Sequence, residues 1–471
     1  MSSNATNSAA GQSPKLEIAI AGGGIAGLIT AIALIKHPGV NIHVYERAEE
    51  LREIGASIAL GPNGLSSLDK LGVKNAFDDN ILYRQRSGWP MVYRHWKTSE
   101  IIGYDEHRNV KDKRFITTRY HRAHLHKALY ENLPSEIVHF GKKLVNVSAD
   151  RDQGVTLSFE DGTTAKADIC IGADGIHSTV RKTLVPDHKI HWTGWVALRA
   201  VYEQSRLDGV DYPEGAAHWV SLPAVTWTQP IYCHANSIIL VKIGHNRHLF
   251  VSPLGKGLYT VVGGYHANLE DPKSRGHGVG WDDQGDVEHF KSFYKDWHPA
   301  IRSITEAAPY IRQFPGYAAD PLETWSFHDR IVLVGDAAHG HGGAFAAGGS
   351  LAINDAHALS LALFHVWPPS ASSRKPSAAE LHRVFEIYQA TRKPQVDRLL
   401  ESVHQSVAGR RVKTDSGSEE TDEQLRKRVS ERMDPYWVAE HDVEAAFEAV
   451  VAKAPSSGHQ VLENKRPQSL L

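Results

Sequence analysis

The chain has 471 residues, with 52 Lys and Arg against 54 Asp and Glu, so its formal net charge is −2. That balance excludes a protein that attracts nucleic acid or an anionic membrane through its overall charge, and a small-molecule partner is expected. The two cysteines, Cys170 and Cys233, support neither a disulfide framework nor a cysteine-based zinc site, and they fit a reducing, cytoplasmic location.

The N-terminal part is predicted to open with a strand, a glycine-rich turn, a helix and a second strand. Residues 1–14 are rich in Ser, Asn and Ala and lack the regions of a signal peptide, which predicts a disordered tail. An apolar run predicts a strand over Leu16–Ala21, and apolar residues at mostly helical spacing follow the glycines. A second strand is predicted over Val40–Tyr45, so this segment begins a doubly wound α/β sheet.

The middle of the chain is predicted to be rich in strands. Alternating apolar and polar residues predict a β-meander over 136–160, and a buried strand follows at 167–172. Residues 192–265 indicate a second domain built on an antiparallel sheet. Its candidate strands include 237–243, 247–252 and 259–265.

The C-terminal part returns to a buried strand and then becomes helical. Residues 330–334 predict the strand, which ends in a Gly-Asp pair. Helices are predicted over 351–366 and 378–407, with a Pro/Ser-rich linker between them. Residues 414–424 predict a mobile loop, and residues 441–452 predict a final amphipathic helix. No apolar run is long enough for a transmembrane helix.

The first chemical motif lies in the N-terminal turn. Gly22, Gly24 and Gly27 satisfy the GxGxxG pattern between a strand and a helix, where the backbone must approach a pyrophosphate closely. Glu46 follows Gly27 by nineteen residues, at the end of the second strand, where a carboxylate accepts hydrogen bonds from a ribose. Together these features predict a dinucleotide site.

Two later motifs bear on which dinucleotide is bound, because NAD and FAD share the ADP moiety. The segment 170–181 contains Asp174-Gly175, and residues 335–339 read Gly-Asp-Ala-Ala-His with Asp336 in second place. Taken singly, the first could be a simple turn and the second a helix cap. Their joint order with the glycine-rich turn argues against coincidence.

With these three motifs the chain resembles the group A FAD-dependent aromatic monooxygenases, which have the para-hydroxybenzoate hydroxylase-like fold, and most of all salicylate hydroxylase and its fungal relatives. The resemblance covers nearly the whole chain. It implies an α/β fold in which an FAD-binding Rossmann-like domain of the glutathione reductase type is interleaved with a β-rich substrate domain and followed by C-terminal helices. The expected segments are 15–75, 115–186 and 305–400 for FAD, 76–114 and 187–304 for substrate, and 401–471 for the helices, loop and tail.

The resemblance also implies which residues bind FAD. It brings in Ala56, Arg122 and the glycine-rich loop after His339 beside the three motifs. The implied FAD-binding residues are Gly22, Gly24, Ile25, Ala26, Gly27, Glu46, Arg47, Ala56, Arg122, Asp174, Gly175, Asp336, Ala346, Ala347 and Gly348.

Three residues are singled out for the reaction itself. Relatives usually carry a proline where this chain has Gly343, and a more flexible backbone is expected there. Arg199 matches a family arginine that could hold a phenolate or carboxylate, and His248 matches a recurring histidine of the substrate sheet. Ordinary structural roles remain open for both. His339 and His341 lack a third ligand at suitable spacing, so no metal is expected.

The resemblance implies an oxidoreductase with FAD as cofactor and NADPH or NADH as co-substrate. It would use O2 to hydroxylate a phenolic substrate through a flavin C4a-hydroperoxide, with decarboxylation if the substrate is salicylate-like. Hydroxylation of a hydroxypyridine, an indole-like ring or a polyketide phenol stays open, as does a non-catalytic flavoprotein. Halogenation is disfavoured because no Trp-x-Trp-x-Ile signature occurs. A monomer or homodimer is expected, with no nucleic acid or membrane partner.

Overall fold

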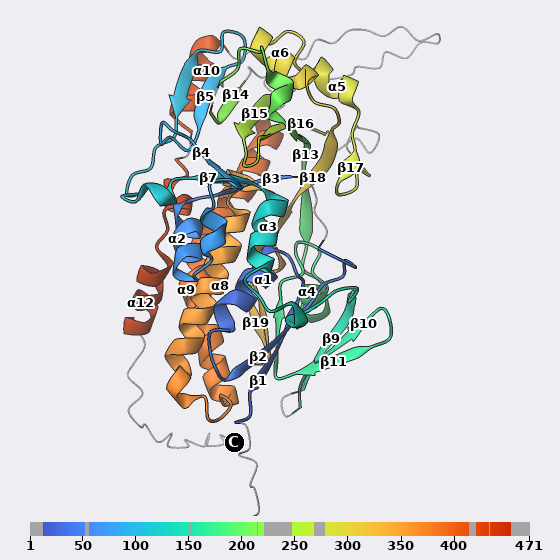
Figure 1. Cartoon of the computed structure of the whole chain (residues 1–471), viewed down its shortest axis with the longest axis vertical. Coiled ribbons are helices and arrows are strands. Elements are labelled where there is room, and N and C mark those ends of the chain that lie inside the picture. The colour runs from blue at the N-terminus through green and yellow to red at the C-terminus, as the bar shows by residue number, and fades with distance from the viewer. Residues whose placement is uncertain are drawn as a thin grey trace, which may run out of the picture.

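The structure is a computed structural model that describes residues 13–51, 56–150, 153–213, 215–220, 247–267, 278–413, 421–432 and 434–453. The predicted strand at 237–243, Cys233 and residues 1–12 of the predicted tail lie outside these ranges. The described part is elongated, with a helix-rich α/β half and a second half built on a large sheet (Figure 1).

The α/β half is organised around a six-stranded sheet in the order β19-β20-β12-β1-β2-β8. Its strands pair in parallel except β19 against β20. They are β1 Leu16–Ala21, β2 Val40–Tyr45, β8 Val138–His139, β12 Ile169–Gly172, β19 Ser326–Phe327 and β20 Ile331–Leu333. β1 is apolar on both faces because both are covered, as central parallel strands are. The predictions for β1 and β2 are confirmed to the residue.

Helices and a small meander enclose this sheet. On one side, helix α8 (Gly348–Val366) packs against both α1 (Ile25–Leu34) and α9 (Ala378–Lys413) (Figure 1). On the other side lies a meander of β9 (Leu144–Asp150), β10 (Gly154–Phe159) and β11 (Thr164–Ala167), whose third strand begins beyond the predicted end at residue 160. The predicted fold class, α/β with C-terminal helices, is confirmed.

The second half is an eight-stranded sheet in the order β17-β18-β13-β16-β15-β14-β5-β6. Its strands are β5 Val92–His95, β6 Ile101–Tyr104, β13 Ile190–Glu203, β14 Ala217–Val220, β15 His248–Pro253, β16 Leu258–His266, β17 Asp283–Gln284 and β18 Arg312–Ala319. One face, which includes Val196 and Leu198, packs on helices α5 (Val287–Ser292) and α6 (Pro299–Glu306) in a separate core. Strand alternation therefore turns Trp195, Ala197 and Arg199 toward the other face.

A three-stranded sheet, β3-β7-β4, lies between the two halves (Figure 1). Its strands are β3 Ser57–Leu60, β4 Leu82–Arg84 and β7 Thr118–His121. β4 lies in an expected substrate segment and β7 in an expected FAD segment, so the pairing of these two strands joins the two proposed domains. β18 also departs from expectation, since it was grouped with the FAD segments but pairs with β13 of the large sheet.

The remaining described helices flank these sheets. They are α2 Pro62–Lys70, α3 Arg122–Tyr130, α4 Thr179–Leu184, α7 Asp336–His339, α10 Asp422–Ser430, α11 Tyr436–Ala439 and α12 Val443–Lys453. Two predictions need correction. α9 continues to Lys413, beyond the expected end at 407, and Thr421 and Gln424, expected in a loop, form the capping box that begins α10. Among the described helices, none is long and apolar enough to cross a membrane.

Candidate active site

The glycine-rich turn between β1 and α1 is shaped by contacts that leave no room for side chains. A Cβ atom on Gly27 would lie 1.9 Å from the carbonyl oxygen of Gly22. Gly22 has φ +105°, and a Cβ there would lie 2.5 Å from the carbonyl oxygen of Ala173. A Cβ on Gly24, by contrast, would meet nothing within 4 Å. The close contacts at Gly27 and Gly22 require glycine in the turn. Gly24 has no such contact, and the space in front of it is open.

That open space lies at the N-terminus of α1, a good place for a phosphate. Gly24 is the N-cap, and neither a capping side chain nor an acidic residue in the first turn satisfies the first helical amides, those of Ile25, Ala26 and Gly27. Such amides and the helix dipole favour an anion. The Glu46 carboxylate at the end of β2 accepts hydrogen bonds from the amides of Gly23 (2.7 Å) and Ala48 (2.9 Å), which places it beside the turn.

The Asp174-Gly175 motif abuts the same turn. One oxygen of Asp174 accepts hydrogen bonds from the amides of Thr179 (2.7 Å) and Val180 (3.1 Å). Its other oxygen, Oδ1, is buried without a hydrogen-bond partner among the described residues. Burial raises the pKa of this carboxyl group. The hydrogen bonds act in the opposite direction, but burial has the larger effect. Gly175 has φ +81°, a conformation that favours glycine.

Asp336 begins α7 and lines the large cavity of the protein. It is exposed to that cavity, and no described residue hydrogen-bonds to its carboxylate. Its main chain is held from behind, since the buried Arg181 guanidinium donates to the carbonyls of Asp336 (3.2 Å) and Ala337 (2.7 Å). The Asp336 carboxylate is therefore presented to a ligand.

A buried ionic cluster supports this motif from the protein side. Asp355 of α8 accepts hydrogen bonds from the Gly335 amide (2.9 Å) and the Arg392 Nε (2.9 Å), and lies 2.6 Å from the His339 Nε2. Burial raises the pKa of Asp355, but His339 and Arg392 outweigh that effect and hold the pKa below its ordinary value. His339 is thus a structural partner of Asp355, and the described residues contain no group of side chains that could hold a metal ion.

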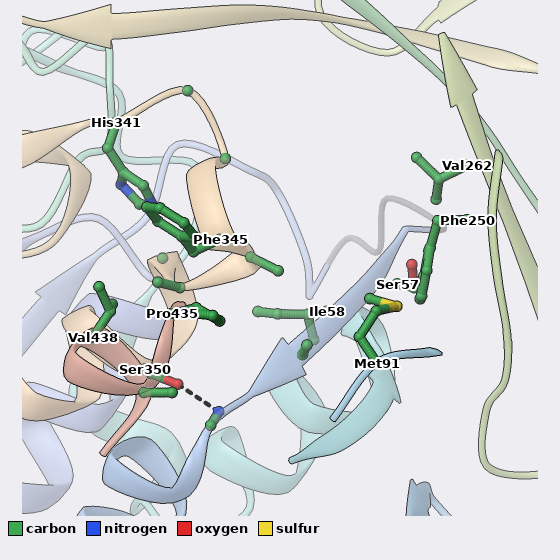
Figure 2. A pocket seen from close by; sticks show the side chains of 18 of the residues that line it. Ser57, Ile58, Met91, Phe250, Val262, His341, Phe345, Ser350, Pro435 and Val438 are labelled. Carbon is green, nitrogen blue, oxygen red and sulfur yellow. Dashed lines mark hydrogen bonds between the residues drawn. The ribbon is translucent and has the colours of Figure 1, made fainter. Parts of the chain in front are cut away.

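The loop from Gly340 to Gly348 forms one wall of the cavity. Gly343 has φ +79° with nothing within 4 Å of an added Cβ, and Phe345 and Ala346 also have positive φ values, 54° and 51°. A proline, whose ring holds φ near −65°, does not fit the conformation of Gly343. His341 and Phe345 point from this loop into the cavity (Figure 2). His341 is buried, which lowers its pKa, and neither ring nitrogen has a hydrogen-bond partner in the described part of the chain.

The cavity has a volume of about 570 Å3 and is bounded on its other side by the eight-stranded sheet. Phe250 and Val262 of that sheet and Met91 face the loop across the cavity (Figure 2). The C-terminal segment from Pro435 to Glu440 closes a further side. Most of the lining surface is apolar, which suits an aromatic ring.

Arg199 is the charged residue of β13 that lines this cavity. Its guanidinium lies 5.3 Å from the centre of the Phe314 ring, and its buried Nε has no hydrogen-bond partner among the described residues. Burial lowers its pKa. Arg199 thus meets the condition for binding an anionic or hydroxyl group of a ligand.

His248 lies in an aromatic cluster on the same sheet face. Its ring is stacked on Trp195 at 4.7 Å and meets His218 edge-on at 4.8 Å. His218 is half-buried, and desolvation lowers its pKa well below the ordinary value. This packing allows a structural role for His248 as well as contact with a substrate.

The structure brings most of the sequence-predicted residues to one connected region. Those that line the cavity are Arg199, His248, Asp336, Gly343, Ala346, Ala347 and Gly348. Arg47 is exposed, and neither it nor Arg122, at the start of α3, is among the lining residues. No motif in the sequence indicated the further cavity-lining residues. They are Arg119, Trp195, His218, Trp281 and the 435–440 segment, which contains α11.

The three cofactor motifs fit one extended dinucleotide. The unsatisfied amides of α1 suit a pyrophosphate, Glu46 suits a ribose, and the Asp336 carboxylate has no protein partner in the described part. Gly24, whose added Cβ would meet open space, is a cradle that a side chain would fill. FAD spans such a row and would reach the loop at Gly343.

Comparison with known proteins agrees with this geometry. The family described as FAD binding domain matches residues 15–210 and 297–402. The chain is 29% identical to a 6-hydroxynicotinate 3-monooxygenase of Pseudomonas fluorescens over 81% of this chain and 88% of the relative. It is 30% identical to the enzyme of the same name from Bordetella bronchiseptica, over 73% and 82%.

A solved structure described as a salicylate hydroxylase substrate complex has the same fold, with a TM-score of 0.71 and 21% identity over 94% of this chain and 100% of that one. The matched family covers more than half of the chain, and its two segments include all three cofactor motifs. The chain therefore belongs to the FAD binding domain family and is an FAD-dependent aromatic monooxygenase.

Proposed function

We propose that the protein hydroxylates a single-ring hydroxy-aromatic acid, such as a hydroxypyridine or benzene carboxylic acid, with NADH or NADPH as reductant. The observation that carries this proposal is the half-buried guanidinium of Arg199, whose Nε is buried without a hydrogen-bond partner among the described residues, in a mostly apolar cavity beside the loop at Gly343. A buried cation without a carboxylate calls for an anionic ligand, because burying an uncompensated charge is costly. The names of the relatives, 6-hydroxynicotinate 3-monooxygenases, support the same substrate class.

The residues of the chain would act by binding, orientation and exclusion of water. Arg199 would hold a hydroxyl group of the substrate in its ionised form, which makes the ring carbons beside it electron-rich. Phe314, Phe250 and Val262 would hold the ring in an apolar slot. Bound FAD would supply the electron transfer from the nicotinamide and the activation of O2.

The 435–440 segment would keep water out. The backbone amides of Arg108 (2.7 Å) and Asn109 (2.9 Å) donate to the Glu440 carboxylate, and the Arg108 guanidinium lies 4.0 Å from the ring centre of Tyr436. These contacts hold the segment against the 105–109 turn of the substrate half. A closed cavity protects a reactive oxygen species from side reactions with solvent.

We also propose a cytosolic location, supported by the buried free thiol of Cys170, which suits a reducing compartment.

The test is oxidation of NADH and NADPH by the purified yellow protein in the presence of 6-hydroxynicotinate, 3-hydroxybenzoate, 4-hydroxybenzoate or salicylate. At least one acid should stimulate oxidation and give a hydroxylated product. Arg199→Met should keep FAD and lower kcat/KM by about 100-fold, since a charge-assisted contact contributes about 1.5–3 kcal/mol. Arg206→Met, at an exposed arginine beyond the end of β13, is the control and should behave as wild type. Equal stimulation of wild type and Arg199→Met would contradict the proposal.

A further inference from the structure

Arg119 is a second arginine that lines the cavity, and neither motif nor spacing indicated it. It lies in β7 of the small linking sheet, paired with Ala59 of β3 and Tyr83 of β4. Its side chain is 3% exposed and lines the cavity. The guanidinium lies 5.6 Å from the centre of the Phe250 ring, which also lines the cavity.

The hydrogen bonds of Arg119 are incomplete. Its Nη2 donates to the carbonyl oxygen of Pro90, whereas its Nη1 is buried without a hydrogen-bond partner among the described residues. No carboxylate of the described chain lies within ion-pair distance of it. Burial lowers the pKa of Arg119 to about 10, so the group stays charged at neutral pH.

Asp105 is an acidic side chain whose charge acts on Arg119, but its carboxylate is already paired with Arg432. Asp105 accepts a hydrogen bond from the Arg432 Nε (3.0 Å) and a second from the Arg432 Nη2, and the Tyr93 hydroxyl donates to its other oxygen (3.1 Å). The Arg432 guanidinium also lies over the Tyr93 ring, 4.2 Å from its centre. This cluster neutralises Asp105 with Arg432, and Arg119 keeps an uncompensated positive charge that faces the cavity.

Arg119 and Arg199 lie toward opposite ends of the cavity. Phe250 on β15 and Arg199 on β13 both face Val262 on the strand between them, so their Cα atoms are about 10 Å apart. Arg119 lies over Phe250, while the Arg199 guanidinium leans the other way, onto Phe314 of β18. One small ring between them can contact both cations only through substituents on distant carbons.

We propose that Arg119 is a specificity-determining residue that binds the carboxylate of the aromatic substrate, at the far end of the ring from the hydroxyl group held by Arg199. This inference rests on the proposed function and deepens it. The unpartnered Nη1 would donate to a carboxylate oxygen, and the charge of the ligand would compensate the buried guanidinium. The substrate is then an acid whose carboxylate is para or meta to the hydroxyl group, and an ortho acid, which presents both groups to one end, binds more weakly.

The experiment is a binding titration of the purified, FAD-loaded protein, followed by the change in the visible flavin spectrum. The ligands are 6-hydroxynicotinate, 4-hydroxybenzoate, 3-hydroxybenzoate and salicylate, together with the neutral amides of the first two. Wild type should bind the para or meta acids at least about 10-fold more tightly than their amides and than salicylate. Arg119→Met should weaken acid binding by about 10- to 100-fold and leave amide binding within about twofold.

Two controls separate a binding role from a structural one. Arg84→Met removes a half-buried arginine of the neighbouring strand that pairs with Asp79 (2.8 Å) and does not line the cavity, so its acid affinity should match wild type. Arg119→Lys keeps the charge without the guanidinium fork, and it should regain part of the preference for acids over amides. FAD content and melting temperature should stay near wild type in both variants.

The outcomes distinguish this inference from the proposed function. If Arg119→Met loses acid and amide affinity equally, or keeps the full preference for acids, Arg119 does not bind the carboxylate, and the proposed function stands. A wild-type protein that prefers salicylate or the amides also overturns the inference while leaving hydroxylation intact. If no acid or amide perturbs the flavin or stimulates NAD(P)H oxidation, the proposed function fails and the inference falls with it.

Discussion

The cofactor turn and the cavity wall differ in how their glycines are used. At Gly27 an added Cβ would come within 1.9 Å of a backbone oxygen, whereas at Gly343 it would meet nothing within 4 Å. The first glycine is required by packing within the fold, and the second only by its backbone conformation, φ +79°. The cofactor turn therefore has no room for a side chain at Gly27, whereas the cavity wall has room for one at Gly343.

The largest expected effect tests this comparison within the turn itself. Gly27→Ala should destabilise the fold by more than about 4 kcal/mol, because its Cβ would collide with the Gly22 carbonyl and the backbone cannot yield. Gly24→Ala is the matched variant, since Gly24 has ordinary φ (−72°) and open space. It should fold with a melting temperature near that of wild-type apoprotein but bind FAD weakly. Equal melting temperatures for the two variants would refute the account.

The next effect concerns the buried cluster beneath Asp336. Asp355→Asn should lower the free energy of unfolding by about 3–4 kcal/mol, because it leaves the Arg392 charge buried without its partner. Denaturant unfolding of the apoprotein at pH 7 measures it. The pKa of Asp355 is held below its ordinary value, so its ion pairs contribute fully above about pH 4, and the wild-type advantage should shrink as the pH falls below that value. An advantage unchanged at pH 3 would contradict this assignment.

An intermediate effect is expected at the cavity wall. Gly343→Pro introduces the residue that the family resemblance leads us to expect at this position, but its ring cannot take φ +79°, so the loop must rearrange. We expect a loss of about 1–3 kcal/mol in stability, retained FAD and a changed fraction of NAD(P)H consumption that ends in peroxide. Melting temperature, flavin content and peroxide yield measure these three quantities. A variant that is as stable as wild type with unchanged coupling would show that the loop conformation is not as described.

The smallest effect lies where α8 meets the C-terminal helix. Burial lowers the pKa of His357 to about 4, so below pH 6.5 the unfolded chain binds a proton that the folded chain does not, and stability falls with the pH. His357→Gln should reduce this loss by about 1 kcal/mol per pH unit between pH 6.5 and 4. Urea unfolding at pH 7.5, 6 and 5 compares the slopes. Identical slopes would mean that folding does not lower the pKa of His357, which would contradict this assignment.

The sequence predicted the cofactor half well, since its signals are local. β1 and β2 carry apolar runs that read as buried strands, and the glycines stand where backbone contacts exclude side chains. The end of α9 and the start of α10 were misplaced because polar residues in solvent-facing helices resemble those of loops.

The cavity was harder to predict because it is assembled from distant strands. Arg119 and Arg199 are 80 positions apart along the chain. They share one cavity because the Arg119 side chain of β7 lies over Phe250 of β15, and because β15 and β13 both pair with β16 in the eight-stranded sheet. A charged residue in a strand usually faces solvent, so nothing local marked Arg119 as buried. Arg199 was found only through the resemblance to a family.

The most direct test of the account is the fate of oxygen in a single experiment. The FAD-loaded protein is incubated with NADH or NADPH, 18O2 and each hydroxy acid of the panel, and the products are analysed by mass spectrometry. We expect one 18O atom in the ring product of a para or meta hydroxy acid. Consumption of NAD(P)H with all of the label in hydrogen peroxide and water, for every acid tested, would contradict it.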